Sequence, residues 1–159
     1  MPTELERRLA ANRQRRYLET AVPKLEALLS SIDGVTWHGF AGDGTMIAEP
    51  WVLARPFFRW SALPDSRILD AATAAERDEW ARGCLRRLGI ANRYCLALGG
   101  DYVGLPWSVV EVPDDGGWFP ALWLRAGMPD ALVLSTDQTR LLYLSEESGD
   151  WFEYLRPVV

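Results

Sequence analysis

The sequence predicts an α+β fold in which residues 1–159 form one domain, with a mainly antiparallel sheet and helices packed on one side. Helical periodicity is confined to a few segments, of which residues 3–32 and 74–88 are the longest. After residue 90 the chain alternates short apolar runs with turns rich in glycine, proline and aspartate, which is typical of strands joined by turns. A chain of this length with an apolar fraction of 48% can bury one core.

Residues 1–33 are predicted to be an N-terminal helical segment. Apolar residues follow a period near 3.6 over residues 3–32, which predicts one long helix. Pro23 lacks a backbone donor, so we expect a kink or split near Ala21–Val22, and Asp33-Gly34 ends the helix. Arginines in the first half are nearly balanced by glutamates, which favours a solvated, salt-bridged face over a nucleic-acid site.

Residues 35–60 are predicted to form three strands. The first two, residues 35–40 and 45–49, flank the turn Ala41-Gly42-Asp43-Gly44, and Asp-Gly between apolar runs is typical of a tight hairpin. The third, residues 51–60, follows Pro50 and contains Pro56. A sheet edge or a bulge is therefore its expected place.

The strongest local signal predicts a helix over residues 74–88, with a short helix over residues 66–71 before it. Thr73 and Glu76 have the spacing of a capping box, in which each side chain accepts a hydrogen bond from the other residue's backbone N–H. Apolar residues then form one stripe, which we expect to face the sheet: Trp80, Cys84, Leu85 and Leu88.

The second half of the chain is predicted to hold strands and one helix. The helix covers residues 118–126, with Pro120 in its first turn and Gly127 after its end. The predicted strands cover residues 93–98, 107–112, 131–135 and 140–145, and a last strand or turn of helix covers residues 151–156.

Few residues could carry catalysis. His38 is the only histidine, and Asp43 is the nearest carboxylate across the turn, but no nucleophile motif surrounds it. A half-exposed strand histidine is the favoured interpretation. Cys84 and Cys95 do not have the spacing of a zinc site or a redox motif, and we expect both to be buried, reduced thiols. A disulfide between them is the alternative, which the cytoplasm disfavours. The sequence thus predicts no catalytic residue, no metal and no cofactor.

The negative charge of the chain lies in its second half. Residues 1–90 carry 13 Lys/Arg and 12 Asp/Glu, whereas residues 91–159 carry 4 and 10 beside four tryptophans. Acidic residues beside aromatic ones suit a surface that binds a basic protein, because opposite potentials steer the encounter and rings anchor it. The candidate partner-binding residues are Asp114, Asp115, Trp118, Glu146, Glu147, Asp150, Trp151 and Glu153.

Other interpretations of these residues stay open. Asp114 and Asp115 could bind a cation or do acid–base work, but the segment around them is also typical of a solvated turn. The tryptophans could pack in the core. Eight of them exceed what one small core needs, so some are expected to be partly exposed, where they suit a protein interface or stacking on a sugar or a base.

The last third of the chain resembles a known family. The runs 130–135, 141–144 and 151–155 resemble the closing strands of the SMI1/KNR4-like immunity superfamily. Size and tryptophan content are also similar to those of the acidic immunity proteins that accompany bacterial polymorphic toxins. The resemblance implies a protein that binds and neutralises a toxin. No functional residue can be carried over, because residues 1–100 do not show the family's earlier signature.

Two functional hypotheses follow. The first is a cytoplasmic protein-binding inhibitor that occludes the basic active-site cleft of a toxin. The alternative is a domain that binds a small molecule or a carbohydrate in a Trp-lined pocket; an enzyme using His38 or the Asp114–Asp115 pair ranks third. Nucleic acid is not an expected partner, since an acidic surface repels phosphates. A membrane is not expected either, since no apolar run approaches the ~18 residues that span a bilayer.

Overall fold

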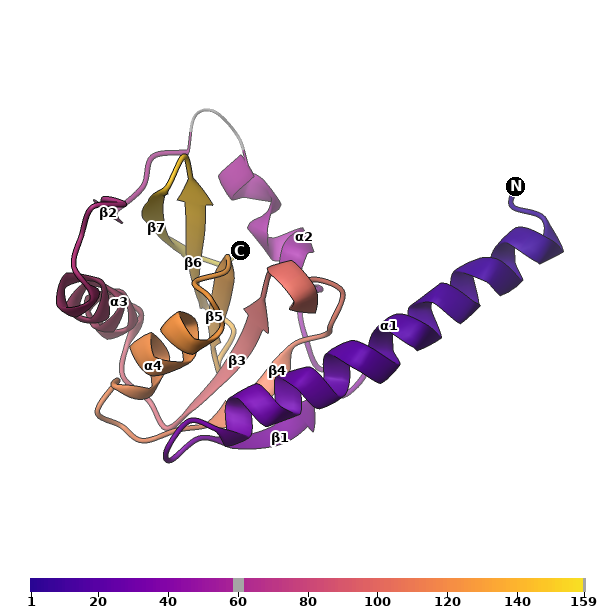
Figure 1. Ribbon diagram of the computed structural model, residues 1–159, viewed down its shortest axis with the longest axis horizontal. Coiled ribbons are helices and arrows are strands. Elements are labelled where there is room, and N and C mark those ends of the chain that lie inside the picture. Colours follow the sequence, from indigo (N-terminus) through magenta and orange to yellow (C-terminus); the bar gives the residue numbers. More distant parts are fainter. Residues whose placement is uncertain (59–61, 159) are drawn as a thin grey trace.

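Seven strands form one sheet in the computed structural model, which describes residues 1–58 and 62–158 (Figure 1). Their order across the sheet is β1-β4-β3-β5-β6-β7-β2, and every neighbouring pair is antiparallel. The bounds are Thr36–Phe40 for β1, Ser66–Ile68 for β2, Arg93–Leu98 for β3, Ser108–Glu111 for β4, Ala131–Ser135 for β5, Arg140–Glu147 for β6 and Asp150–Pro157 for β7. The predicted α+β class with a mainly antiparallel sheet is confirmed.

The three longer helices pack on one face of this sheet. They are α1 (Glu4–Ser30), α3 (Ala74–Leu88) and α4 (Trp118–Arg125), and only the second half of α1 reaches the domain (Figure 1). Their buried side chains meet the sheet residues that point to the same side, and together they form the larger core: among them are Leu29, Leu85, Phe119, Leu96, Val133 and Leu142.

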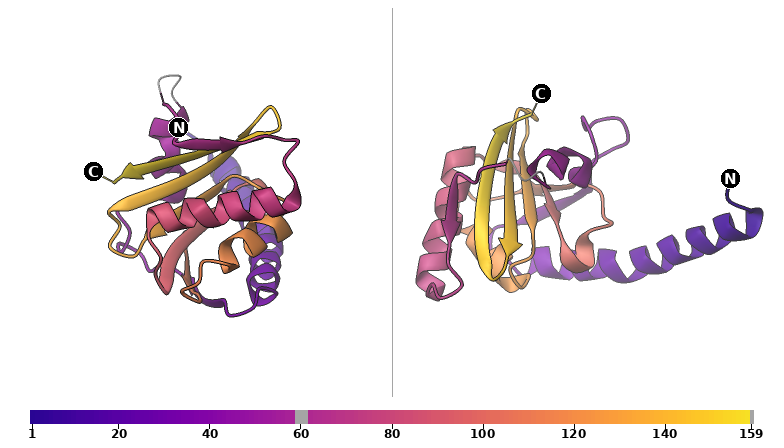
Figure 2. Two further views of the ribbon diagram at one scale, coloured as in Figure 1. Left: turned by 90° about the vertical axis from the view of Figure 1, so that its left-hand side faces the viewer. Right: turned by 90° about the horizontal axis from the view of Figure 1, so that it is seen from above.

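A short helical segment covers the opposite face. It consists of α2 (Pro50–Ala54) and the 3-10 helix η1 (Arg55–Phe58), and α2 lies across the sheet from α3 (Figure 2). Ala54 and Phe57 pack there on Leu132 and Tyr143 in a second core. Trp107 anchors the approach to this segment, because its indole N–H donates to the carbonyl oxygen of Ala48 at 2.9 Å.

This segment differs from the prediction. Residues 45–48 form bends and residue 49 is irregular, in place of a strand, and residues 51–58 are helical; residues 59–60 of the predicted third strand lie outside the described residues. Pro50 occupies the first turn of α2, where its missing N–H and fixed φ suit a helix start. The two prolines thus mark a helix start rather than an edge strand. The helix predicted over residues 66–71 is also wrong, since β2 pairs there with β7.

The two long helices otherwise follow the sequence signals. No split occurs in α1 at Pro23, which is exposed, so the helix carbonyl that loses its partner can bind water. The capping box of α3 is confirmed: the Glu76 N–H donates to the Thr73 hydroxyl at 3.1 Å and the Thr73 N–H to the Glu76 carboxylate at 2.8 Å. At the other end of α3, the Arg140 guanidinium donates to the carbonyl oxygens of Arg87 and Leu88.

Candidate interaction surfaces

The hairpin of β6 and β7 presents acidic side chains at its tip. Ser148 and Gly149 connect the strands with positive φ angles of 55° and 92°, as a two-residue type I′ turn requires. Glu146 and Glu147 precede this turn and are exposed, and Asp150 follows it and is half-buried. The eight-residue strands pair along their whole length, so the tip is held on a rigid support.

Two further carboxylates join the hairpin tip from other segments. The Glu146 N–H donates to Asp130 at 3.1 Å, and the Asp70 N–H donates to Asp150 at 2.9 Å. Gly149 allows this close approach, since a Cβ at that position would lie 3.2 Å from Asp70. We define the acidic corner as the five residues Asp70, Asp130, Glu146, Glu147 and Asp150.

The charge of the acidic corner is not compensated within the described chain. None of the nine ion pairs between described residues includes one of its five carboxylates. The Arg77 guanidinium donates instead to the backbone oxygen of Asp70, at 2.5 Å. Its central carbon lies 5.3 Å from the ring centroid of Trp151. A basic partner would therefore meet carboxylates that no described side chain engages in an ion pair.

Trp151 and Glu153 do not belong to this surface, so their predicted role as partner contacts is wrong. Trp151 is only 7% exposed; it packs against Trp123 with the ring centroids 6.0 Å apart. Glu153 is fully buried and accepts hydrogen bonds from Arg87 (2.7 Å) and from the Ser66 hydroxyl (2.7 Å). Both residues point to the helix-covered face, because side chains two apart in a strand share a face.

The buried Glu153 carboxylate changes the ionisation of its neighbours. The hydrogen bond from Arg87 to Glu153 raises the pKa of the guanidinium. Burial raises the pKa of the nearby Cys84 thiol, and the charge of Glu153 adds to that shift. Cys84 and Cys95 are buried and not joined by a disulfide, so the expectation of structural thiols is confirmed.

The predicted residues of the β4–α4 loop form a separate group. Asp114 and Asp115 are exposed, and Asp115 accepts a hydrogen bond from the Gly117 N–H at 2.9 Å, as in a solvated turn. Trp118 is 3% exposed, so it is a core residue and its predicted partner contact is also wrong. A hollow of about 280 Å³ beside it is lined by Asp33, Asp115 and Arg125, among others.

The two acidic groups lie at opposite ends of α4. Asp114 and Asp115 precede its first residue, whereas the hairpin contacts the segment after its last turn, where the Trp151 indole N–H donates to the Met128 carbonyl. The fold therefore brings Glu146, Glu147 and Asp150 together with Asp70 and Asp130. It does not bring them to Asp114 and Asp115.

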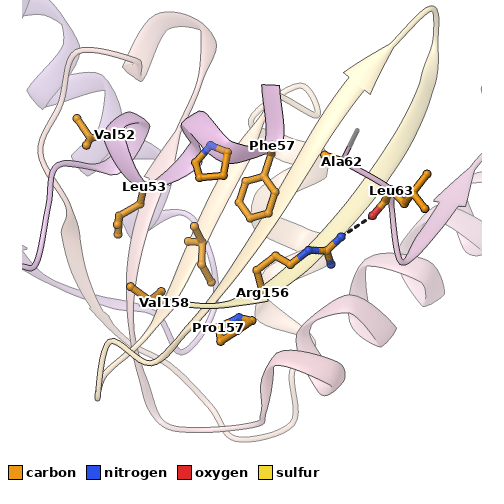
Figure 3. A pocket seen from close by; sticks show the side chains of 10 residues that line it. Val52, Leu53, Phe57, Ala62, Leu63, Arg156, Pro157 and Val158 are labelled. Atoms are coloured by element: carbon orange, nitrogen blue, oxygen red, sulfur yellow. Dashed lines mark hydrogen bonds between the residues drawn. The ribbon is translucent and has the colours of Figure 1, made fainter. Parts of the chain in front are cut away.

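An apolar groove of about 700 Å³ lies between α2, η1 and the end of β7 (Figure 3). Leu53, Phe57 and Val158 line it, and the rim residues Val52 and Leu63 are 43% and 75% exposed. Arg156 closes one side, where it donates to Asp65 at 2.6 Å and to the Leu63 carbonyl at 2.5 Å. No tryptophan is among its described lining residues, so the expected Trp-lined pocket is not found there.

The tryptophans of the described chain are mostly core residues. Trp107, Trp118, Trp123 and Trp151 are buried, and the remaining described ones, Trp37, Trp51 and Trp80, are half-buried. The expectation that some are partly exposed is confirmed for these three.

His38 has a different carboxylate partner from the one nearest in sequence. Its Nε2 lies 3.1 Å from Glu111 on the neighbouring strand β4, and Glu111 also accepts from Arg93 at 3.2 Å. The hydrogen bond from Arg93, followed by that from His38, lowers the pKa of Glu111. The ring has no hydroxyl or thiol hydrogen-bond partner among the described residues, so this group lacks the nucleophile of a catalytic triad.

Metal-site geometry is also missing from the described residues. No group of three or more His, Cys, Asp or Glu side chains converges there as metal ligands would, and this includes the carboxylates of the acidic corner. No helix among residues 1–58 and 62–158 combines the length and apolar character needed to cross a bilayer.

Comparison of the whole chain with protein-family models, with curated proteins and with solved structures found no match.

Proposed function

We propose that the protein binds another protein and inhibits it, as the immunity partner of a bacterial toxin. The observation that supports this proposal is the acidic corner: five carboxylates from four chain segments, none of them ion-paired within the described residues. Like charges gathered at one corner create a negative potential there, which favours the approach of a cation. A basic surface on a partner provides such cations.

The shape of the corner suits occlusion of a cleft. A two-stranded hairpin with a tight turn is narrow, and its paired strands keep it from folding back. Inserted into a basic active-site cleft, it would exclude the substrate sterically while its carboxylates neutralise the cleft. Charges of this kind chiefly accelerate association, and buried contacts around them slow dissociation.

The proposal includes the cellular setting and excludes two partner classes. We place the protein in the cytoplasm, which agrees with two buried thiols that form no disulfide. Nucleic acid is not the proposed ligand, because the exposed carboxylates of the corner would repel phosphates. A membrane is not the proposed ligand either, because anionic headgroups would be repelled in the same way.

Charge reversal tests the role of the acidic corner. A partner is first captured from the source organism, and its activity is assayed with and without the protein. The Glu146→Lys/Glu147→Lys double variant should then bind at least about tenfold more slowly at low salt, and the loss should shrink as ionic strength rises. The matched control is Glu26→Lys/Asp43→Lys, which changes the net charge equally at exposed sites outside the corner. Equal slowing in both variants would reject the corner as the contact.

The groove supports a second candidate function, the binding of an apolar small molecule. Its volume of about 700 Å³ lies in the range of ligand pockets, and its rim exposes Val52 and Leu63. Saturable binding of an apolar fluorescent dye that is lost in Leu63→Glu, together with no captured protein, would favour this candidate over the first. Leu63 is a suitable position because its exposed side chain can be replaced without opening the core.

A further inference from the structure

The first half of α1 projects from the domain without support (Figures 1 and 2). Every residue from Met1 to Arg16 is exposed. Contact with the domain begins at Tyr17, whose hydroxyl donates to the Asp101 carbonyl and accepts from the Gly104 N–H. We call residues 4–16 the arm, which is about 20 Å long at the rise of an α-helix. A helix of this length is marginal in water alone, so a packing partner would stabilise it.

One face of the arm has the spacing of a helix–helix contact. Leu5, Leu9, Asn12 and Arg16 follow one another at intervals of four, three and four residues, which places them in one stripe. The leucines are 66% and 45% exposed although they are apolar. By the 3.6-residue period this stripe lies nearly opposite the face that carries Leu25, which packs on the domain. A second helix could therefore lie along the stripe without meeting the domain.

When two copies of the arm pair in one of the two possible orientations, charges beside the stripe of one copy face opposite charges of the other. Glu6 and Arg13 flank it on the same side, seven residues apart. When two arms run antiparallel, with Leu9 of each beside Asn12 of the other, Glu6 of each lies beside Arg13 of the other. A parallel pair would instead place Arg8 beside Arg13 of the second copy, and like charges repel.

On the other side of the stripe, charge repulsion between the two antiparallel copies is weak. Arg8 and Arg15 of the two copies approach each other there, but each has a glutamate of its own helix as partner. Arg8 lies 3.0 Å from Glu4, and Arg15 lies 4.0 Å from Glu19. Arg13 has no ion-pair partner within the described residues, so its charge is available to a second copy.

We propose that the arm is a self-association element through which two copies of this chain pair in antiparallel orientation. The orientation also suits the charge of the whole chain. Residues 1–20 carry five arginines and three glutamates, so the remainder of a chain with net charge −5 carries −7. Antiparallel arms hold the two acidic domains at opposite ends of the pair, where their repulsion is screened. The proposal uses none of the residues of the acidic corner, so it can fail while the inhibitor function stands.

Sedimentation equilibrium of the full chain tests the proposal. Over about a hundredfold range of concentration the mass should rise from that of one chain to that of two. Arg13→Glu should raise the dissociation constant about tenfold, because two attractive pairs become repulsive. Glu6→Lys should do the same. The combined Glu6→Lys/Arg13→Glu variant should regain most of the affinity, which separates the cross-pair from the part that Glu6 plays in capping α1.

The matched control is Arg7→Glu, the same charge change on the far side of the arm, which should alter the dissociation constant by about twofold or less. A monomeric mass at every concentration would overturn the proposal, as would equal effects of Arg7→Glu and Arg13→Glu. Binding of a single-stranded DNA oligonucleotide that both variants weaken alike, without self-association, would assign the arm to polyanions instead.

Discussion

At the scale of single residues, burial of Glu153 depends on one guanidinium. The carboxylate is fully buried and accepts from Arg87 through both Nε and a terminal nitrogen, with Ser66 as its other partner. Trp80 donates its indole N–H to the same Ser66 hydroxyl at 2.9 Å. The network therefore joins α3 to β2 and β7, the strands at one edge of the sheet.

Removal of this guanidinium should destabilise the fold. Arg87→Ala leaves a buried charge without its cation; breaking a fully buried pair costs about 3–5 kcal/mol. Because the Arg87 side chain is 46% exposed, water can replace part of it, and we expect a loss of about 2–3 kcal/mol in urea denaturation. Arg86→Ala, which breaks an exposed pair, should change stability by about 0.5 kcal/mol or less. If the Arg87→Ala/Glu153→Gln variant is no more stable than Arg87→Ala, the buried charge is not the cause.

Trp151 and Glu153 were predicted at the surface for one and the same reason. Trp151 and Glu153 stand in a strand whose alternate side chains face opposite sides, and the sequence alone does not say which set faces the helices. Glu153 faces the helices, but an acidic residue is expected at the surface unless its partner is known. That partner, Arg87, is 66 residues away in the sequence. Asp70 and Asp130 were missed for a similar reason, since only the fold brings them to the hairpin.

At the scale of elements, local signals predicted α3 and most strands well. A capping box fixed the start of α3, and turn residues fixed the strands β3, β5 and β6. The segment from residue 45 to 58 failed because its prolines suit a helix start as well as an edge strand. Its helical form depends on packing against Tyr143 and Leu132, which lie about 80 residues further along and leave no local signal.

Packing of α3 on its neighbours can be measured at Trp80. The ring is half-buried, 5.7 Å from that of Trp123, and its N–H is bonded to Ser66. Trp80→Ala should cost about 3 kcal/mol of stability, at the low end for a core aromatic residue. Trp80→Phe keeps an aromatic ring but not the hydrogen bond, so its loss should be nearer to 1 kcal/mol. Equal losses in both variants would mean that the hydrogen bond, and not the ring, carries the stability.

At the scale of the whole molecule, the sheet serves two cores at once. Along β5, Val133 belongs to the core under the long helices and Leu134 to the core under α2 and η1. Because both cores pack on the same strands, disruption of the sheet would expose both of them. The acidic corner and the groove lie at the margins of this shared structure, where charge and apolar surface are left without partners in the described chain.

This sharing predicts cooperative unfolding of the domain. Trp118, Trp123 and Trp151 report on the first core and Trp107 on the second, so fluorescence follows both. Unfolding in urea should therefore give one transition, with the same midpoint by fluorescence and by near-ultraviolet circular dichroism. The variant Trp107→Phe removes one reporter of the second core, where Trp51 remains, and Trp123→Phe one of the first; each should retain a single transition by both probes. Two midpoints within either variant would show that the two cores unfold separately, which contradicts the prediction.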